Sequence, residues 1–89
     1  MNVEFAPQAW QDFVHWQEAD PKVVQKIIEL IEQVRRTPFT GLGKPEPLKG
    51  PLKGYWSRRI TSEHRLVYGV VGTGDAQKVR VLQCRWHYE

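Results

Sequence analysis

Apolar residues recur with a helical period in the first part of the chain. Across residues 7–19 they fall one and three positions apart and predict an amphipathic helix with one apolar stripe, formed by Ala9, Trp10, Phe13 and Trp16. Asp20-Pro21 is typical of an N-cap followed by proline at the first helical position. Apolar positions then recur every three or four residues up to Val34, which predicts a second helix that ends at Thr37-Pro38.

The apolar pattern changes to a period of two near the end of the chain. Three runs rich in Val, Tyr, Trp and Ile predict strands at residues 55–60, 64–71 and 78–86, and Val3–Phe5 is a short extended start. The short links between the three runs favour hairpins, so an antiparallel meander is expected. We expect one α+β domain over residues 1–89, with both helices on one face of the sheet and the other face free.

A long segment between the second helix and the first hairpin has loop composition. Residues 37–54 hold four of the six prolines and four of the seven glycines, which excludes regular helix. Loops of this length in compact domains are usually functional or disordered. In the helix before it, Glu32 and Arg36 are spaced for an i, i+4 ion pair.

Cationic side chains concentrate in the stretch from Lys44 to Arg65. It carries three lysines and three arginines against Glu46 and Glu63. Residues 1–34 hold two lysines and six acids, a net charge of −4, whereas residues 35–89 hold eleven cations and four acids, a net charge of +7. A polyanion would therefore meet the second half of the chain, and the aromatic residues there suit nucleic-acid bases.

Cysteine content and hydropathy narrow the classes of protein. Cys84 is the only cysteine, so an internal disulfide and a cysteine-rich zinc site are excluded. No apolar run approaches the ~18 residues of a membrane span, and no signal-peptide pattern is present. We expect a cytoplasmic protein with no membrane partner.

Several segments together resemble one known family. They are Trp16-Gln17, RRTPF at 35–39, GKPEPLK at 43–49, WSRRI at 56–60, EHRLVY at 63–68 and CRWHY at 84–88. In this order they are similar to the YoeB-type branch of the RelE toxin superfamily. The resemblance implies a compact RelE-like fold and the toxin of a type II toxin–antitoxin module. It also implies a metal-independent endoribonuclease without a cofactor that cuts mRNA in the A site of the 70S ribosome, and a YefM-like antitoxin as partner. A chain of 89 residues buries only a modest core, which leaves a homodimer open.

The resemblance also assigns roles to residues. RNA cleavage by 2′-hydroxyl attack needs a base, a group that neutralises the phosphorane, and an acid for the leaving 5′-oxygen. Glu46 matches the family's base, Arg65 supplies a permanent bidentate donor, and His87 is the candidate acid. Tyr88 matches a terminal tyrosine that helps to position the nucleotide.

Further cations are candidates for binding the RNA backbone, namely Lys44, Lys49, Arg58 and Arg59. Adjacent strand residues point to opposite faces, so only one of Arg58 and Arg59 faces substrate, and the family pattern favours Arg59. Taken alone, Glu46 is more typical of a solvated loop acid paired with Lys44 or Lys49, and Arg65 of a salt bridge on the sheet face, for example to Glu63. His15 and His64 are expected to be structural or surface groups, and of the two His64 is the candidate exception.

Two other functions fit the same residues. A non-catalytic module that blocks translation by occupying RNA or the ribosome would use the same basic aromatic surface, and a protein-interaction scaffold would use the apolar helices. The sequence also departs from the family pattern at three places: Trp86 stands where tyrosine is common, Glu89 extends past the usual terminal tyrosine, and residues 72–79 form a longer link.

Overall fold

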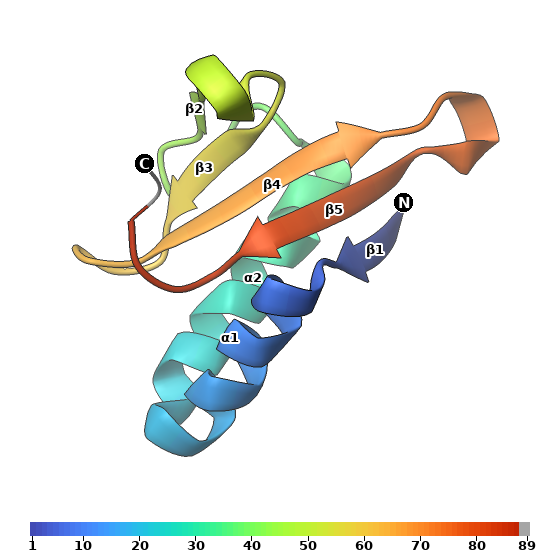
Figure 1. Ribbon diagram of the computed structural model, residues 1–89. Coiled ribbons are helices and arrows are strands. Elements are labelled where there is room, and N and C mark those ends of the chain that lie inside the picture. Colours follow the sequence, from blue (N-terminus) through green and yellow to red (C-terminus); the bar gives the residue numbers. More distant parts are fainter. Residues whose placement is uncertain (88–89) are drawn as a thin grey trace.

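The computed structural model describes residues 1–87. It contains two helices and a five-stranded sheet (Figure 1). In chain order the elements are β1 (Asn2–Phe5), α1 (Pro7–Ala19), α2 (Pro21–Arg36), β2 (Glu46–Pro47), β3 (Trp56–Arg59), β4 (Arg65–Val71) and β5 (Lys78–Gln83). The α+β fold class and both helices are as predicted. No helix among these residues is long and apolar enough to span a membrane.

The sheet is mixed, which corrects the prediction of an antiparallel meander. Strand order is β1-β5-β4-β3-β2; β3, β4 and β5 pair antiparallel, but β1 pairs parallel to β5, with Val3 opposite Val79. Figure 1 shows β1 beside β5 at the edge of the sheet. The short N-terminal run therefore completes the sheet. Two of the predicted strands were too long. β5 ends at Gln83 rather than at residue 86, and β3 ends at Arg59 rather than at residue 60.

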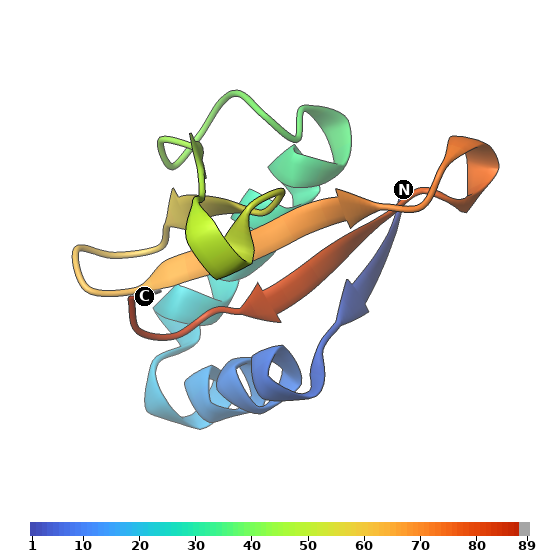
Figure 2. The same ribbon diagram turned by 45° about the horizontal axis from the view of Figure 1, so that its top comes forward.

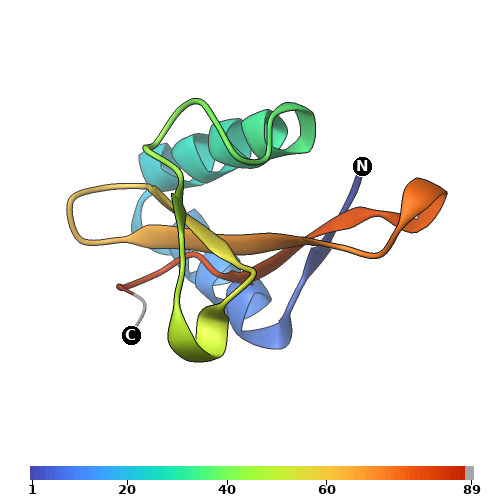
Figure 3. The same cartoon turned by 90° about the horizontal axis from the view of Figure 1, so that it is seen from above.

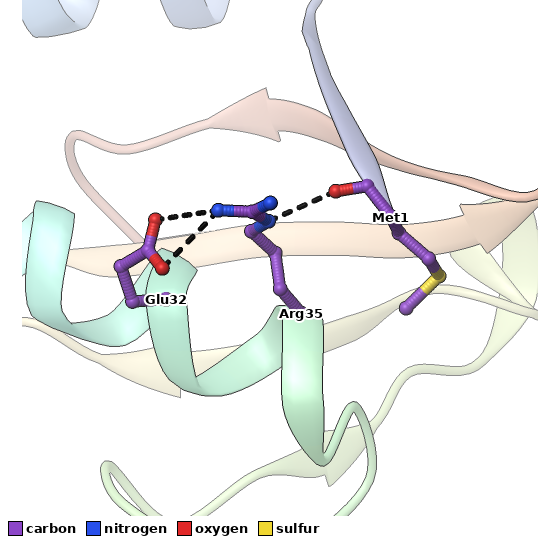
Figure 4. Close-up of polar contacts among 3 residues, drawn as sticks. All are labelled: Met1, Glu32 and Arg35. Atoms are coloured by element: carbon purple, nitrogen blue, oxygen red, sulfur yellow. Dashed lines mark hydrogen bonds and ion pairs between the residues drawn. The ribbon is translucent and has the colours of Figure 1, made fainter.

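Both helices begin where the capping residues place them. Pro7 and Pro21 open α1 and α2, and Asp20 Oδ1 accepts a hydrogen bond from the Lys22 N–H at 3.1 Å. The predicted pair of Glu32 with Arg36 is wrong, since Glu32 pairs with Arg35 at 2.9 Å (Figure 4). Arg35 Nε also donates to the Met1 carbonyl at 2.9 Å, which fastens the start of β1 to α2.

The core lies between the helices and one face of the sheet. Buried side chains come from both helices and from alternate positions of the strands, namely Ala9, Trp16, Val23, Ile27, Leu30, Ile31, Val34, Leu66, Tyr68, Val79 and Val81. Trp10 was predicted in this stripe but is 54% exposed, and Asp12 is buried on α1 instead. The stripe therefore runs through Ala9, Asp12 and Trp16, at spacings of three and four.

The second face of the sheet is partly covered, contrary to the expectation of a free face. Ser57, Val67 and Gly69 point away from the helices and are buried. A Cβ atom at Gly69 would lie 2.7 Å from the Tyr55 ring, so this ring packs directly on the backbone there. Figure 3 shows α2 on one side of the sheet and the loop with the short 3-10 helix Gly50–Leu52 on the other.

Candidate functional site

Glu46 lies at the start of a row of residues that crosses four strands. The register places Glu46 opposite Ser57, Ser57 opposite Val67, and Val67 opposite Gln83. Directly opposed residues share a face of the sheet, with Cβ atoms ~5 Å apart. Glu46 is exposed, whereas Ser57 and Val67 beside it are buried. The carboxylate is thus held at the edge of a covered sheet face by β2, although the sequence predicted only loop there.

Arg59 and Arg65 lie directly opposite each other on the same sheet face, two residues along their strands from the Ser57–Val67 pair. Arg59 in β3 pairs with Arg65 in β4. Arg59 is exposed and Arg65 is half-buried, with Nη1 donating to the Thr61 carbonyl at 2.8 Å and the Ser62 carbonyl at 3.2 Å. The Arg65 side chain is therefore held by the β3–β4 turn, and not by a salt bridge to Glu63, which was the alternative for Arg65 taken alone. Like charges directly opposed in a sheet are destabilising, so this pair favours an anion between the guanidinium groups.

The segment after β5, residues 84–87, lies beside Arg65 at the start of β4. The Arg65 N–H donates to the Trp86 carbonyl at 3.0 Å, and Gln83 Nε2 donates to the carbonyls of Arg85 at 3.1 Å and His87 at 3.4 Å. His87 is exposed and follows directly on the residue bonded to Arg65. Figures 1 and 3 show residues 84–87 ending beside the start of β4. The register thus places Glu46 and Arg65 on one sheet face, and the hydrogen bonds bring the backbone of His87 to the end of that face.

Three side chains that sequence reasoning did not place in the site hold this C-terminal segment. Asp12 Oδ2 accepts from the Cys84 N–H at 3.1 Å, Trp16 Nε1 donates to the Cys84 carbonyl at 2.9 Å, and His64 Nδ1 accepts from the Trp86 N–H at 2.8 Å. Cys84 is buried, and burial raises the pKa of its thiol to about 12, so the thiol stays protonated. The helical pattern predicted Asp12 on the polar side of its helix, so its burial beside Cys84 comes from the structure alone.

Arg58 is wrongly predicted as an RNA-binding residue, because its side chain is fully buried on the helix-facing side of the sheet. Nη2 donates to the carbonyls of Thr37 at 2.6 Å and Thr40 at 2.9 Å, Nη1 to that of Leu42 at 3.0 Å, and Nε to Tyr68 Oη at 3.0 Å. Burial raises the pKa of the Tyr68 phenol, which donates to the Pro38 carbonyl at 2.6 Å. A cation is well placed here because the C-terminal end of α2 carries partial negative charge.

This buried arginine shapes the loop that leads to Glu46. The loop arches from the end of α2 to β2 (Figure 2). Gly43 has φ +86°, and its Cβ position lies 3.0 Å from Leu30 and 3.1 Å from Arg58, so only glycine fits there. The Gly43 carbonyl also accepts from the Arg59 N–H at 2.8 Å. The loop is thus fixed by contacts on both sides before it enters β2.

Of the remaining cationic side chains, two lysines are exposed and two arginines contact other side chains. Lys44 and Lys49 are exposed on the loop that carries Glu46. Arg80 is not available to RNA in the same way, because it pairs with Glu4 at 2.6 Å. The guanidinium of Arg85 stacks over the Trp86 ring at 4.6 Å. Tyr88 lies outside the described residues, and residues 1–87 contain no cluster of three or more His, Cys, Asp or Glu side chains arranged for a metal ion.

Chemically, the site combines one exposed carboxylate, two arginines that are opposite each other in the sheet register, and an imidazole at the end of a segment held by hydrogen bonds. Such a set can bind a phosphodiester, remove one proton and donate another. The neighbouring lysines extend the positive surface along the path that a polyanion would follow.

Comparison with known proteins identifies the family. A family model described as "YoeB-like toxin of bacterial type II toxin-antitoxin system" matches residues 5–88. The chain is 53% identical to "Toxin YoeB" of Escherichia coli K12 over 88 residues, which cover 99% of this chain and 100% of that protein. Sequence and family model therefore agree over almost the whole chain.

Solved structures agree with this assignment. The "YoeB/ParE toxin from Agrobacterium tumefaciens" is 55% identical, with a TM-score of 0.94 and coverage of 99% of this chain and 100% of that one. YoeB from Staphylococcus aureus, solved both as a heterotetrameric YoeB–YefM complex and as a dimer, is 45% identical, with TM-scores of 0.85 and 0.84 and coverage of 99% and 98%. The RelBE2 toxin–antitoxin complex of Mycobacterium tuberculosis, at 23% identity and a TM-score of 0.68 over 97% and 96% of the chains, shares the RelE-like fold. The chain belongs to the YoeB family of toxins from bacterial type II toxin–antitoxin systems.

Proposed function

We propose that this toxin is a ribosome-dependent endoribonuclease that cuts mRNA in the A site and so inhibits translation. The observation that supports the proposal most strongly is the register of β3 with β4, which sets Arg59 opposite Arg65 on the sheet face that also carries Glu46. The guanidinium groups of Arg59 and Arg65 would bind a phosphate, and the Glu46 carboxylate lies at the edge of the same sheet face. The end of the C-terminal segment, with His87, is bonded to the backbone of Arg65 through Trp86.

The reaction divides among these groups. Glu46 takes the proton from a ribose 2′-hydroxyl, and the 2′-oxygen forms a bond to the adjacent phosphorus. Arg65 and Arg59 neutralise the additional charge on the phosphorane. The bond from phosphorus to the 5′-oxygen then breaks as His87 donates a proton to that oxygen. The products are a 2′,3′-cyclic phosphate and a 5′-hydroxyl. The scheme assigns no step to a metal ion, and Tyr88 is proposed to position the nucleotide, with Lys44 and Lys49 on the RNA backbone.

A cleavage assay on a translating ribosome complex tests the assignment. Wild type is compared with Glu46→Ala, Arg65→Ala and His87→Ala. We expect each variant to lose about 100-fold or more in rate, since each removes a proton-transfer or charge-stabilising group. Undiminished cleavage by these variants would exclude the mechanism. Translation arrest by the wild type on an intact message would instead support the alternative, a module that blocks by occupancy.

We also propose a YefM-like antitoxin as the partner in this cytoplasmic module, because the related Staphylococcus aureus protein was solved with YefM. An antitoxin segment that carries acids would neutralise the lysines and arginines around Glu46 and cover the site. The toxin is therefore expected to lose nuclease activity when purified together with its antitoxin. Equal activity of free toxin and complex would refute this inhibition. Because that protein was also solved as a dimer, we propose that the free toxin self-associates as well.

A further inference from the structure

We propose that His64 is a positioning residue for the cleavage reaction, because its ring holds the backbone of the C-terminal segment that carries His87. This inference rests on the proposed function. His64 Nδ1 accepts a hydrogen bond from the Trp86 N–H at 2.8 Å, and Trp86 immediately precedes His87. No step of the proposed reaction uses His64 directly.

The ring of His64 is itself held in a fixed orientation. It packs edge-on against Trp16, with centroids 4.7 Å apart and an interplanar angle of 79°, and lies 5.3 Å from the Trp86 ring. Its backbone closes the β3–β4 turn, since the His64 carbonyl accepts from the Ile60 N–H at 3.0 Å. The acceptor that meets Trp86 is therefore presented by a rigid support.

Trp86 adopts a backbone conformation that needs such support. Its φ is +66°, in the left-handed region that side chains other than glycine rarely adopt. Conformations of this kind persist where several contacts fix them, and they cluster at functional sites. Here both polar backbone groups of Trp86 are bonded to consecutive residues, the N–H to His64 and the carbonyl to the Arg65 N–H at 3.0 Å. The two bonds lock the residue before His87 onto the residue that carries the proposed phosphate-binding guanidinium.

The bond requires a neutral His64, with its proton on Nε2. A protonated imidazole has a hydrogen on both nitrogens and cannot accept from Trp86. Burial lowers the pKa of His64 from its ordinary 6.5, and Arg85, His87 and His15 act in the same direction, against Glu63. The contact is therefore present at pH 6.5 and above, and it is lost as the pH falls through the lowered pKa of His64 in the folded protein.

Two substitutions separate hydrogen bonding from packing. His64→Phe keeps an aromatic ring between Trp16 and Trp86 but removes the acceptor, while His64→Asn keeps an acceptor near the place of Nδ1. His15→Phe is the matched control, because His15 also packs on Trp16, at 5.1 Å, and makes no hydrogen bond to residues 84–87. The measurements are single-turnover cleavage on ribosome complexes over a range of toxin concentrations, and amide NMR spectra of the free toxin.

We expect His64→Phe to lower the maximal rate about 10- to 100-fold with little change in half-saturating concentration, because the proposed acid is misplaced rather than RNA binding lost. His64→Asn should recover most of this rate, and His15→Phe should equal wild type. Equal rates for His64→Phe and wild type, or equal losses in both His64 variants, would overturn the proposal. If His64→Phe folds poorly, His64→Leu replaces it, since leucine also lacks the acceptor.

The NMR arm separates failure of this inference from failure of the proposed function. In wild type the Trp86 amide signal should move as the His64 imidazole titrates, and this movement should be absent in His64→Asn. If the wild type does not cut RNA at all, the proposed function has failed. A Trp86 amide that ignores the His64 titration would refute the positioning role even in an active nuclease.

Discussion

Two adjacent arginines, Arg58 and Arg59, have different roles in this toxin. Arg58 is fully buried and satisfies carbonyls at the end of α2 and in the following loop, whereas Arg59 is exposed opposite Arg65. Their separation follows from the alternation of side chains along β3. Arg58 fixes the loop that leads to Glu46, and Arg59 belongs to the proposed phosphate-binding site.

Alanine substitution should separate these duties. Arg58→Ala leaves several carbonyl groups without their donor, so we expect the free energy of unfolding to fall by about 3 kcal/mol. Arg59→Ala should change it by less than about 0.5 kcal/mol but slow cleavage about 10- to 100-fold, as expected for loss of a charged hydrogen bond to phosphate. Urea unfolding and the ribosome assay measure both quantities. A stable Arg58→Ala or a fully active Arg59→Ala would contradict these roles.

Sequence reasoning reached some of these residues and missed others for physical reasons. Alternation predicted that only one of Arg58 and Arg59 faces substrate, and the family pattern favoured Arg59. The buried carbonyl cluster that selects Arg58 forms only when the α2 end and β3 meet, so no local pattern revealed it. His64 and Asp12 likewise acquire their contacts from a segment about 20 and 70 residues away along the chain.

At the level of elements, the parallel strand β1 is the main difference from the predicted fold. Its extended start was foreseen, but a run of a few residues gives no sign of its partner strand. The partner is β5, and Glu4 links the two by ion pairs to Lys78 at 2.8 Å and Arg80 at 2.6 Å. The helices were easier to predict, because their caps and periods are local.

The Glu4 contacts predict an acid sensitivity of this strand pair. Hydrogen bonds from Lys78 and then Arg80 hold the pKa of Glu4 below its ordinary 4.5. A lowered carboxylate pKa contributes stability that is present above pH 4.5 and is lost as the pH falls through the folded value. Glu4→Gln should therefore reduce the loss of stability between pH 5 and about pH 3, with melting temperature as the measurement. An identical pH dependence in variant and wild type would refute the linkage.

Across the whole molecule, negative charge predominates in the first part of the sequence and positive charge in the second part. The positive part is the one that carries the proposed site. Residues 1–34 carry −4 and form β1, α1 and most of α2, while residues 35–89 carry +7 and include the strands with the site. A ribosome-bound message would approach the second group, because the first repels it. The buried core between the layers holds both in one orientation.

This division predicts salt dependence that is specific to position. Lys49→Ala should lower the slope of log affinity against log salt concentration for the ribosome–mRNA complex by about 0.7, the value for one phosphate contact on a single strand. Lys22→Ala, an exposed lysine at the start of α2, is the control and should leave the slope unchanged. Equal slopes for Lys49→Ala and wild type would show that Lys49 does not contact the backbone.

The most direct test of the proposed reaction changes the substrate rather than the protein. A message with a single 2′-deoxynucleotide at the cleaved position is placed in the A site of a translating complex and compared with the unmodified message. We expect the toxin to cut the unmodified message to a 2′,3′-cyclic phosphate and a 5′-hydroxyl and to leave the modified message intact. Equal cleavage of both messages, or no cleavage of either, would contradict the account.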